Sequence, residues 1–447
     1  MRTFTLHFLI AFLSFKASAQ GLKEYVDLSV SHAWSYQQGL IHLRMAEAKW
    51  LDAKSAFDPS LSWMDRGKQT DAQTAYRYQE TQLKIPVMGG VSILGMGQWG
   101  NGPWLNPESK VPMGGLAGVG VSFPVGPQIW FSESQQKVEM AALQVDIARA
   151  DLEVLKQEVT KHAVANFIEW SLAYREMEAY AESLSRLESQ LVQMRSAFTL
   201  GGVARKDTLE LSAYRELRKS QYLEALQAEV AAFQKLRTFA GSSAVNVSWQ
   251  PMHFEVAAIG AISSLHMLLI ERAPKFNLLQ AKQEQAVTNS RFERAQRWNV
   301  PDISLNVLQY ADSFNPYGSA WKVSWELPVL NRKNRAERQL ANLYLEELAL
   351  NEEFLFQEFK NRQVQWESQL PISLKNVQTM EEQASIYREL WELEEQSFEL
   401  GYSSVFMKNQ RELAYLDAQI KRNKAVGSHY KLLTEWAALT GQHIEWP

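Results

Sequence analysis

The chain alternates between stretches whose apolar residues have a helical spacing and shorter stretches in which apolar and polar residues alternate. Residues 132–200 contain no proline or glycine, and apolar residues recur there at three- and four-residue steps, as at Leu143, Ile147 and Leu152. This spacing predicts one very long amphipathic helix of roughly 100 Å, at about 1.5 Å per residue. A helix of that length needs partners along its whole length, so we expect coiled-coil packing.

A period of two replaces the helical spacing in residues 117–123, 302–307 and 320–327. Each of these segments predicts a β-strand with one apolar face and one polar face. Such a strand fits a sheet with one face in lipid or a protein core and the other in water. A half-exposed sheet of a soluble protein is the alternative, and the very long flanking helices favour the membrane interpretation. We therefore expect a lipid-facing set, Trp321, Val323 and Trp325, and a lumen-facing set, Lys322, Ser324 and Glu326.

The chain contains an internal duplication. The sequence Phe-Thr-Leu-Gly at 198–201 recurs as Phe-Glu-Leu-Gly at 398–401, a spacing of 200 residues. Each half has the order helix, Pro-marked switch, strands, Pro-Val, very long helix, Leu-Gly turn and return helix. We predict a first repeat at 20–241, with two strands and a long loop, and a second at 242–447. The Gly- and Pro-rich residues 65–112 are the predicted loop, which we expect on the extracellular side of a barrel.

The N-terminus has the pattern of a secretory signal peptide. Arg2 is followed by an apolar stretch at 4–15 and by small residues at 17–19, so we predict cleavage after residue 19. The apolar stretch is too short to span a bilayer as a helix. The chain contains no cysteine, so its stability must come from packing and association rather than from disulfides.

Candidate chemistry is sparse. The net charge of −4 gives no electrostatic case for a nucleic-acid partner. The eight His residues show no metal-ligand spacing, and we identify no catalytic, cofactor-binding or metal residue. Residues 95–100 match the dinucleotide pattern G-x-G-x-x-G, but the following Asn-Gly-Pro is a poor helix start, so we interpret them as barrel loop. An enzyme is not indicated, and a soluble periplasmic coiled-coil scaffold or adaptor remains the alternative to a channel.

Five short motifs in this order resemble the TolC family of outer-membrane efflux proteins. They are Glu-Arg-Ala-Pro at 271–274, Pro-Asp-Ile-Ser-Leu at 301–305, Leu-Pro-Val-Leu at 327–330, Phe-x-Leu-Gly before each return helix, and Ala-Leu-Thr-Gly at 438–441. The resemblance covers nearly the whole mature chain. It implies an α+β membrane protein that forms a homotrimer. A periplasmic α-helical barrel would continue into a twelve-stranded transmembrane β-barrel, with four strands from each chain.

The resemblance also implies a function. The protein would be the passive outer-membrane exit duct of a tripartite efflux or type I export system, bound to a periplasmic adaptor and an inner-membrane transporter. The adaptor would dock at the helical tips, for which we expect Leu200, Gly201, Asp207, Leu400, Gly401 and Ser404. The chain departs from the family pattern at 402–410, which contain no acidic residue, so a strongly cation-selective tip is not expected.

Overall fold

The computed structural model describes residues 21–70, 73–103, 115–125, 132–241, 249–253, 273–295, 302–311, 318–326 and 332–441. These belong to two compact units. Unit 1 comprises residues 1–38, 154–273 and 357–447, and unit 2 comprises residues 39–153 and 274–356. The predicted signal peptide and the Pro-Val motif at 328–329 lie outside the described residues.

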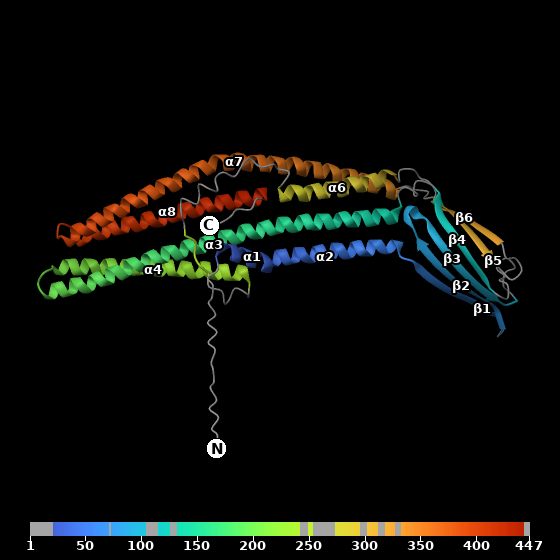
Figure 1. Cartoon of the computed structure of the whole chain (residues 1–447), viewed down its shortest axis with the longest axis horizontal. Helices are drawn as coiled ribbons and strands as arrows, with labels where there is room; N and C mark the ends of the chain where they lie inside the picture. Colours follow the sequence, from blue (N-terminus) through green and yellow to red (C-terminus); the bar gives the residue numbers. More distant parts are fainter. Residues whose placement is uncertain are drawn as a thin grey trace, which may run out of the picture. The chain divides into compact units, whose positions relative to one another are not determined.

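The helices and strands follow the order predicted from the sequence, with additions in the first half (Figure 1). The first half contains α1 (Leu22–His32), α2 (Trp34–Lys54), the 3-10 helix η1 (Ser55–Phe57), β1 (Ser60–Thr70), β2 (Gln73–Pro86), η2 (Met88–Gly90), β3 (Ser92–Asn101), β4 (Leu116–Val125), α3 (Glu133–Thr199) and α4 (Arg205–Ala240). The second half contains α6 (Pro274–Ala295), β5 (Asp302–Ala311), β6 (Gly318–Glu326), α7 (Arg332–Glu399) and α8 (Val405–Thr440). The fold class is confirmed, because long helices combine with one antiparallel sheet.

The very long helix predicted at 132–200 is α3, and its counterpart in the second half is α7, which continues through Pro371. Their lengths of 67 and 68 residues are nearly equal, and the return helices α4 and α8 have 36 residues each. The two Leu-Gly turns therefore stand at corresponding places in the two halves. Within the described ranges, no helix combines the length and the apolar content needed to cross a bilayer.

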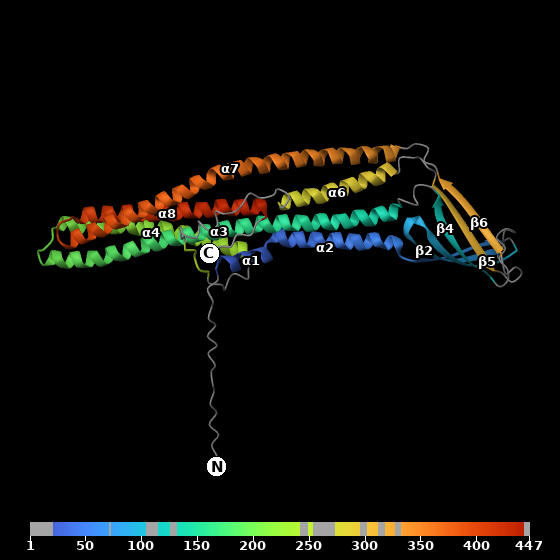
Figure 2. The same ribbon diagram turned by 45° about the horizontal axis from the view of Figure 1, so that its top comes forward.

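The sheet belongs to unit 2 and has the strand order β1-β2-β3-β4-β5-β6, with every neighbouring pair antiparallel (Figure 2). β1, β4, β5 and β6 adjoin the helices, and β4, β5 and β6 lie where the sequence predicted strands, whereas β1 extends into residues 65–70 of the predicted loop. β2 and β3 are two further strands. They occupy part of residues 65–112, for which we predicted a long loop, and that prediction is wrong for the described residues up to 103. Glycines on one face of β3 hid its period of two, as shown below.

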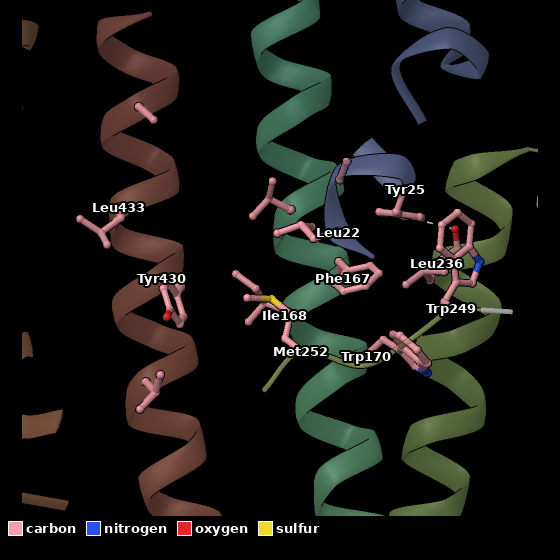
Figure 3. Close-up of a cluster of buried hydrophobic side chains, with 14 of the residues drawn as sticks. Leu22, Tyr25, Phe167, Ile168, Trp170, Leu236, Trp249, Met252, Tyr430 and Leu433 are labelled. Atoms are coloured by element: carbon pink, nitrogen blue, oxygen red, sulfur yellow. Dashed lines mark hydrogen bonds between the residues drawn. The ribbon is translucent and has the colours of Figure 1, made fainter. Parts of the chain in front are cut away.

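The core of unit 1 surrounds Tyr25 of α1 (Figure 3). The Tyr25 side chain is fully buried, and its hydroxyl donates a hydrogen bond to the carbonyl of Leu236 in α4 at 3.2 Å. The rings of Phe167 in α3 and Trp249 lie with their centroids 5.3 Å from the Tyr25 ring. Burial raises the pKa of Tyr25 to about 12, so the hydroxyl remains a hydrogen-bond donor at any physiological pH.

All four long helices contribute to this core. α8 supplies its fully buried Val426, Tyr430 and Leu433, and α7 supplies Val377. The helical spacing of apolar residues in the sequence therefore reflects burial between helices, as expected for helices too long to be stable alone. In unit 2, Leu348 of α7 packs against Leu279 of α6.

Candidate functional sites: an apolar sheet face and two helical tips

The register of the sheet places the odd-numbered residues of its strands in line with one another. In one row, Ile85 pairs with Ile93, Ile93 with Val121, Val121 with Val307, and Val307 with Trp321. Paired residues in a sheet share a face, and successive residues of a strand alternate between faces. This row is therefore apolar at every position across five strands.

The apolar row belongs to a face that is open to the surroundings. Its exposed apolar side chains are Leu61, Trp63, Leu83, Ile93, Trp99, Val119, Val121, Trp321 and Val323, and we call this surface the apolar sheet face. Scattered exposed apolar residues are normal, but a contiguous apolar face of this extent marks a contact with a membrane or a protein. Trp321 is 76% exposed and Val323 49% exposed. The side chains of Trp325, Lys322, Ser324 and Glu326 lie outside the described residues.

The even-numbered residues form the opposite face, which is polar. On β1 and β2 they include Arg66, Lys68, Glu80, Gln82 and Lys84. The Tyr78 hydroxyl donates to Glu80 at 2.7 Å, and the Arg66 guanidinium lies 5.7 Å from the centre of the Tyr78 ring. The sheet is thus apolar on one face and hydrogen-bonded and charged on the other, which is the arrangement of a strand between lipid and a watery lumen.

Polar residues limit the apolar sheet face at the end away from the helices. Asp65 and Arg77 form an ion pair there, with 2.6 Å between Oδ2 and Nη2, and Gln79 donates to the same carboxylate oxygen at 3.1 Å. Asp65 follows Leu61 and Trp63 at two-residue steps on the same face of β1. On β1 the apolar sheet face therefore ends at Asp65 and forms a band rather than covering the whole strand.

The glycines of the G-x-G-x-x-G pattern lie within this band, in β3. A Cβ atom on Gly97 would come within 2.8 Å of the Trp99 ring, so the indole lies over the glycine backbone. A Cβ on Gly95 would lie 3.7 Å from the Leu83 Cβ. Trp99 and Leu83 thus cover the apolar sheet face at Gly97 and Gly95, where β3 itself has no side chain. The interpretation of residues 95–100 as a loop is wrong, and the next element that the structure describes after β3 is the strand β4 rather than a helix that could bind a pyrophosphate.

The two Leu-Gly turns have the same hydrogen-bonded geometry. Gly201 has φ +77° and donates to the Phe198 carbonyl at 3.0 Å, while the next N–H, of Gly202, donates to the Ala197 carbonyl at 2.9 Å. Gly401 has φ +78°, and the corresponding bonds run from Gly401 to Phe398 at 3.0 Å and from Tyr402 to Ser397 at 2.9 Å. This pair of bonds is the Schellman motif, which ends a helix by a residue in the left-handed conformation.

Large apolar side chains project at both turns. Leu200 is 85% exposed and Leu400 71% exposed, and Tyr402 and Leu209 are exposed beside them. We call this set of four the tip surface. The sequence interpretation named the two leucines but missed Tyr402 and Leu209. For Tyr402 the available signal was a large aromatic residue directly after Gly401, where a solvated turn would have a small polar one, and no such signal marked Leu209.

Beneath the tip surface the two helical hairpins pack on one another. Leu187 and Leu191 of α3, Leu211 of α4 and Val405 of α8 form a buried cluster, with Phe398 of α7 at its edge. The two turns are therefore held by a common core.

The predicted polar tip residues have local structural roles. The Ser404 hydroxyl accepts a hydrogen bond from the Met407 N–H at 3.2 Å and caps α8. Asp207 lies in the first turn of α4 and is partly exposed. Lys408, in the stretch without acidic residues, is buried and pairs with Glu395 of α7 at 3.1 Å. Glu394 and Glu395, near the end of α7, thus pair with Arg411 and Lys408 of α8.

A buried charge cluster lies further along the hairpins. Glu412 of α8 is 3% exposed, and its Oε1 accepts from the Ser183 hydroxyl at 2.8 Å and from Arg186 at 3.1 and 3.2 Å. Arg218 of α4 is also buried, and burial lowers its pKa while the charge of Glu412 acts in the opposite direction. Among the described residues no group of three or more His, Asp or Glu side chains could hold a metal ion.

Solved structures with the same fold are outer-membrane channels. The chain superposes on CusC, a transmembrane channel, with a TM-score of 0.67 and 11% identity over 94% of this chain and 92% of that one. The CmeC channel of Campylobacter jejuni superposes with a TM-score of 0.62 and 13% identity over 94% of this chain and 85% of that one. The outer-membrane protein VceC of Vibrio cholerae superposes with a TM-score of 0.64 and 12% identity over 94% of this chain and 96% of that one. No family model matches the chain, and no curated protein matches it in sequence.

Proposed function

We propose that this chain, which has the fold of the TolC-family outer-membrane channels, is the outer-membrane exit duct of a tripartite efflux or type I export system. The single observation that carries the proposal is the apolar sheet face. It is exposed on strands β1 to β4 and β6, and a polar face lies behind it. A soluble periplasmic scaffold, the alternative, has no use for a band of this kind.

The duct is a homotrimer. Unit 2 ends in a sheet whose edge strands β1 and β6 have no partner among the described residues, and a membrane sheet needs closure because its free edges cannot be hydrated in lipid. The helices also expose apolar residues that a second copy would cover. On α2 these include Trp34, Ile41 and Met45, and on α7 Leu343 and Leu350.

The helical tips bind a periplasmic adaptor, which links the duct to an inner-membrane transporter. The apolar contacts come from the tip surface, Leu200, Leu400, Tyr402 and Leu209. The duct is passive, and the energy for export comes from the transporter. The remaining tip residues predicted from the sequence have structural rather than chemical roles at this surface. They are Gly201, Gly401, Asp207 and Ser404.

Thiol labelling of the full chain tests the membrane assignment, and it has no native background because the chain lacks cysteine. In cells, the Val121→Cys thiol on the apolar sheet face is expected to react with a lipid-soluble maleimide and to resist a membrane-impermeant one. The Gln82→Cys thiol on the polar face is the matched control, and we expect it to react with a small water-soluble reagent. Equal reaction of both with the impermeant reagent, or recovery of the protein as a soluble periplasmic monomer, would refute the proposal.

A further inference from the structure

Basic side chains are concentrated where helices of unit 2 meet the sheet. Six of them lie in the last two turns of α6 and the first two turns of α7, and we call this set the basic cluster: Arg291, Arg294, Arg332, Lys333, Arg335 and Arg338. The same stretches, residues 289–295 and 332–338, contain two acidic residues, Glu293 and Glu337. Six positive and two negative charges give these stretches a net charge of +4, although the whole chain has −4.

Little of this positive charge is neutralised within the part of the chain that the structure describes. Glu293 is buried, so its carboxylate adds little negative charge to the surface. Glu337 approaches Lys333 at 3.9 Å between Oε1 and Nζ, and the Lys333 side chain remains 84% exposed. Four arginines of the cluster are exposed, and no described carboxylate lies within ion-pair distance of them: Arg291, Arg294, Arg332 and Arg335.

The fold itself does not favour cations at the start of α7. Arg332 and Lys333 lie in its first turn, close to the positive end of the helix macrodipole, which disfavours cations. Arg335 follows Arg332 by three residues, so the two guanidinium groups occupy neighbouring positions on the helix surface and repel each other. We therefore expect these side chains to have an anionic partner from outside the chain.

The basic cluster also lies at the level expected for lipid headgroups. Five residues separate the end of β6 at Glu326 from the start of α7 at Arg332, so the two Cα atoms are at most about 22 Å apart. Both lie at the end of the sheet where the helices begin (Figure 2). A headgroup layer extends roughly 5–7 Å beyond the hydrocarbon on each side, and long basic side chains can reach into it. The first turn of α7 is therefore within reach of the headgroups of the leaflet that faces the helices.

The end of α2 independently indicates a membrane–water boundary at this level. The Lys54 ammonium lies 3.2 Å from the centre of the Trp50 ring, and Leu51 is 70% exposed beside them. Five residues separate Lys54 from the start of β1 at Ser60, as many as separate β6 from α7. Tryptophan and lysine are typical of the membrane–water interface, where the indole lies among the headgroups and the ammonium group reaches the phosphates.

We propose that the basic cluster binds the anionic headgroups of phospholipids in the leaflet that faces the helices. The proposal rests on the membrane assignment of the proposed function, and it names the class of lipid that this part of the duct recognises. Five of the six residues are arginines, whose planar guanidinium groups can donate two hydrogen bonds to one phosphate diester. A group of about four to eight basic residues beside a membrane-spanning segment is typical of proteins that bind anionic lipid. Free phosphate has the same charge chemistry but lacks the acyl chains that the apolar sheet face would contact.

Native mass spectrometry of the full chain in a mild detergent tests the proposal. Phosphatidylglycerol, which is anionic, and phosphatidylcholine, which is zwitterionic, are added together at equal concentration and with the same acyl chains. One basic residue near an anionic surface favours binding about fivefold, so we expect about five bound phosphatidylglycerol molecules for each phosphatidylcholine. In the triple variant Arg332→Gln/Lys333→Gln/Arg335→Gln this ratio is expected to fall towards one.

A second triple variant serves as the matched control, because it removes the same number of positive charges from helices of unit 1. Its three lysines are exposed and form no ion pair with another described residue: Lys219→Gln in α4, and Lys360→Gln and Lys375→Gln in α7. We expect this control to keep the lipid ratio of the unmodified protein.

Three results would overturn the proposal. The first is a lipid ratio near one in the unmodified protein, or an unchanged ratio in the Arg332→Gln/Lys333→Gln/Arg335→Gln variant. The second is loss of the oligomer in that variant at an unchanged ratio, because the basic cluster then pairs with acidic residues of a neighbouring copy. The third is displacement of phosphatidylglycerol by excess inorganic phosphate, because the cluster then binds free anions.

The proposed function fails in a different experiment. Equal labelling of Val121→Cys and Gln82→Cys by the impermeant maleimide refutes the duct itself. A protein that passes that labelling test but shows no preference for phosphatidylglycerol refutes only the headgroup site.

Discussion

The buried charge cluster around Glu412 allows a prediction whose size follows from the exposure of its members. Glu412 and Arg218 are buried, with exposed fractions of 3% and 4%, whereas the Arg186 side chain is 38% exposed. Replacing Glu412 with Gln removes the anion but keeps a hydrogen-bond acceptor for Ser183. Arg186 can then turn to water, but Arg218 stays buried without a counter-charge.

The expected cost is set mainly by Arg218. Removing one partner of a buried pair costs about 3–5 kcal/mol, and we expect about 3 kcal/mol for Glu412→Gln because one arginine becomes solvated. Arg186→Gln leaves Glu412 with Ser183 and the charge of Arg218, so its expected cost is smaller, about 1–2 kcal/mol. The double variant Glu412→Gln/Arg218→Met removes both buried charges and should recover at least half of the loss.

Hydrogen exchange of the α3, α4 and α8 amides in the detergent-solubilised protein measures these effects locally. Glu412→Gln should speed exchange around residues 183, 218 and 412, and the double variant should slow it again. Thermal unfolding followed by helical circular dichroism gives the global counterpart. If the two substitutions add without recovery, the charge of Arg218 is not the source of the cost and the reasoning fails.

Three further predictions concern the tips, the helical core and the sheet. Gly401→Ala should weaken adaptor binding through backbone strain alone, about 1–2 kcal/mol, because no atom lies within 4 Å of the added Cβ. Gly401→Asn should bind the adaptor better than Gly401→Ala, and equal binding by the wild type and both variants would contradict this. His429 Nδ1 lies 3.1 Å from the Ser373 hydroxyl, and burial lowers the pKa of His429. The stability of the protein should therefore be constant above about pH 6.5 and fall below it, because the unfolded chain gains a proton there that the folded chain does not. Melting curves of His429→Gln should show a smaller loss of stability between about pH 7 and pH 5. Val121→Arg on the apolar sheet face should cost about 2–4 kcal/mol in lipid and reduce the yield of heat-stable trimer on gels, whereas Gln82→Arg on the polar face should leave it unchanged.

Most of the helical part could be predicted from the sequence because its signals are long and redundant. The apolar spacing over 132–200 extends for many turns, and it matches α3 within a residue at each end. The repeated Phe-x-Leu-Gly located both turns, since a glycine after a helix favours the left-handed conformation that Gly201 and Gly401 adopt. The burial of Lys408 could not be predicted, because Glu395 pairs with it from a different helix.

The sheet was predicted only where side chains reveal a period of two. In β4 and β6, valine or tryptophan alternates with smaller or polar residues, and both strands were found. In β3, Gly95 and Gly97 occupy positions of the apolar face, so the alternation disappears from the sequence. Only the register shows that Leu83 and Trp99 cover these positions from neighbouring sites.

The contact between Trp99 and Gly97 has a consequence for how this strand can change through evolution. A Cβ at 97 would meet the indole at 2.8 Å, so a side chain there would require the half-exposed Trp99 ring to turn away from the strand. A Trp99 loss on its own would open a bare stretch of backbone in the middle of the band. Homologues with tryptophan at 99 should therefore carry glycine at 97 more often than homologues with a small residue at 99.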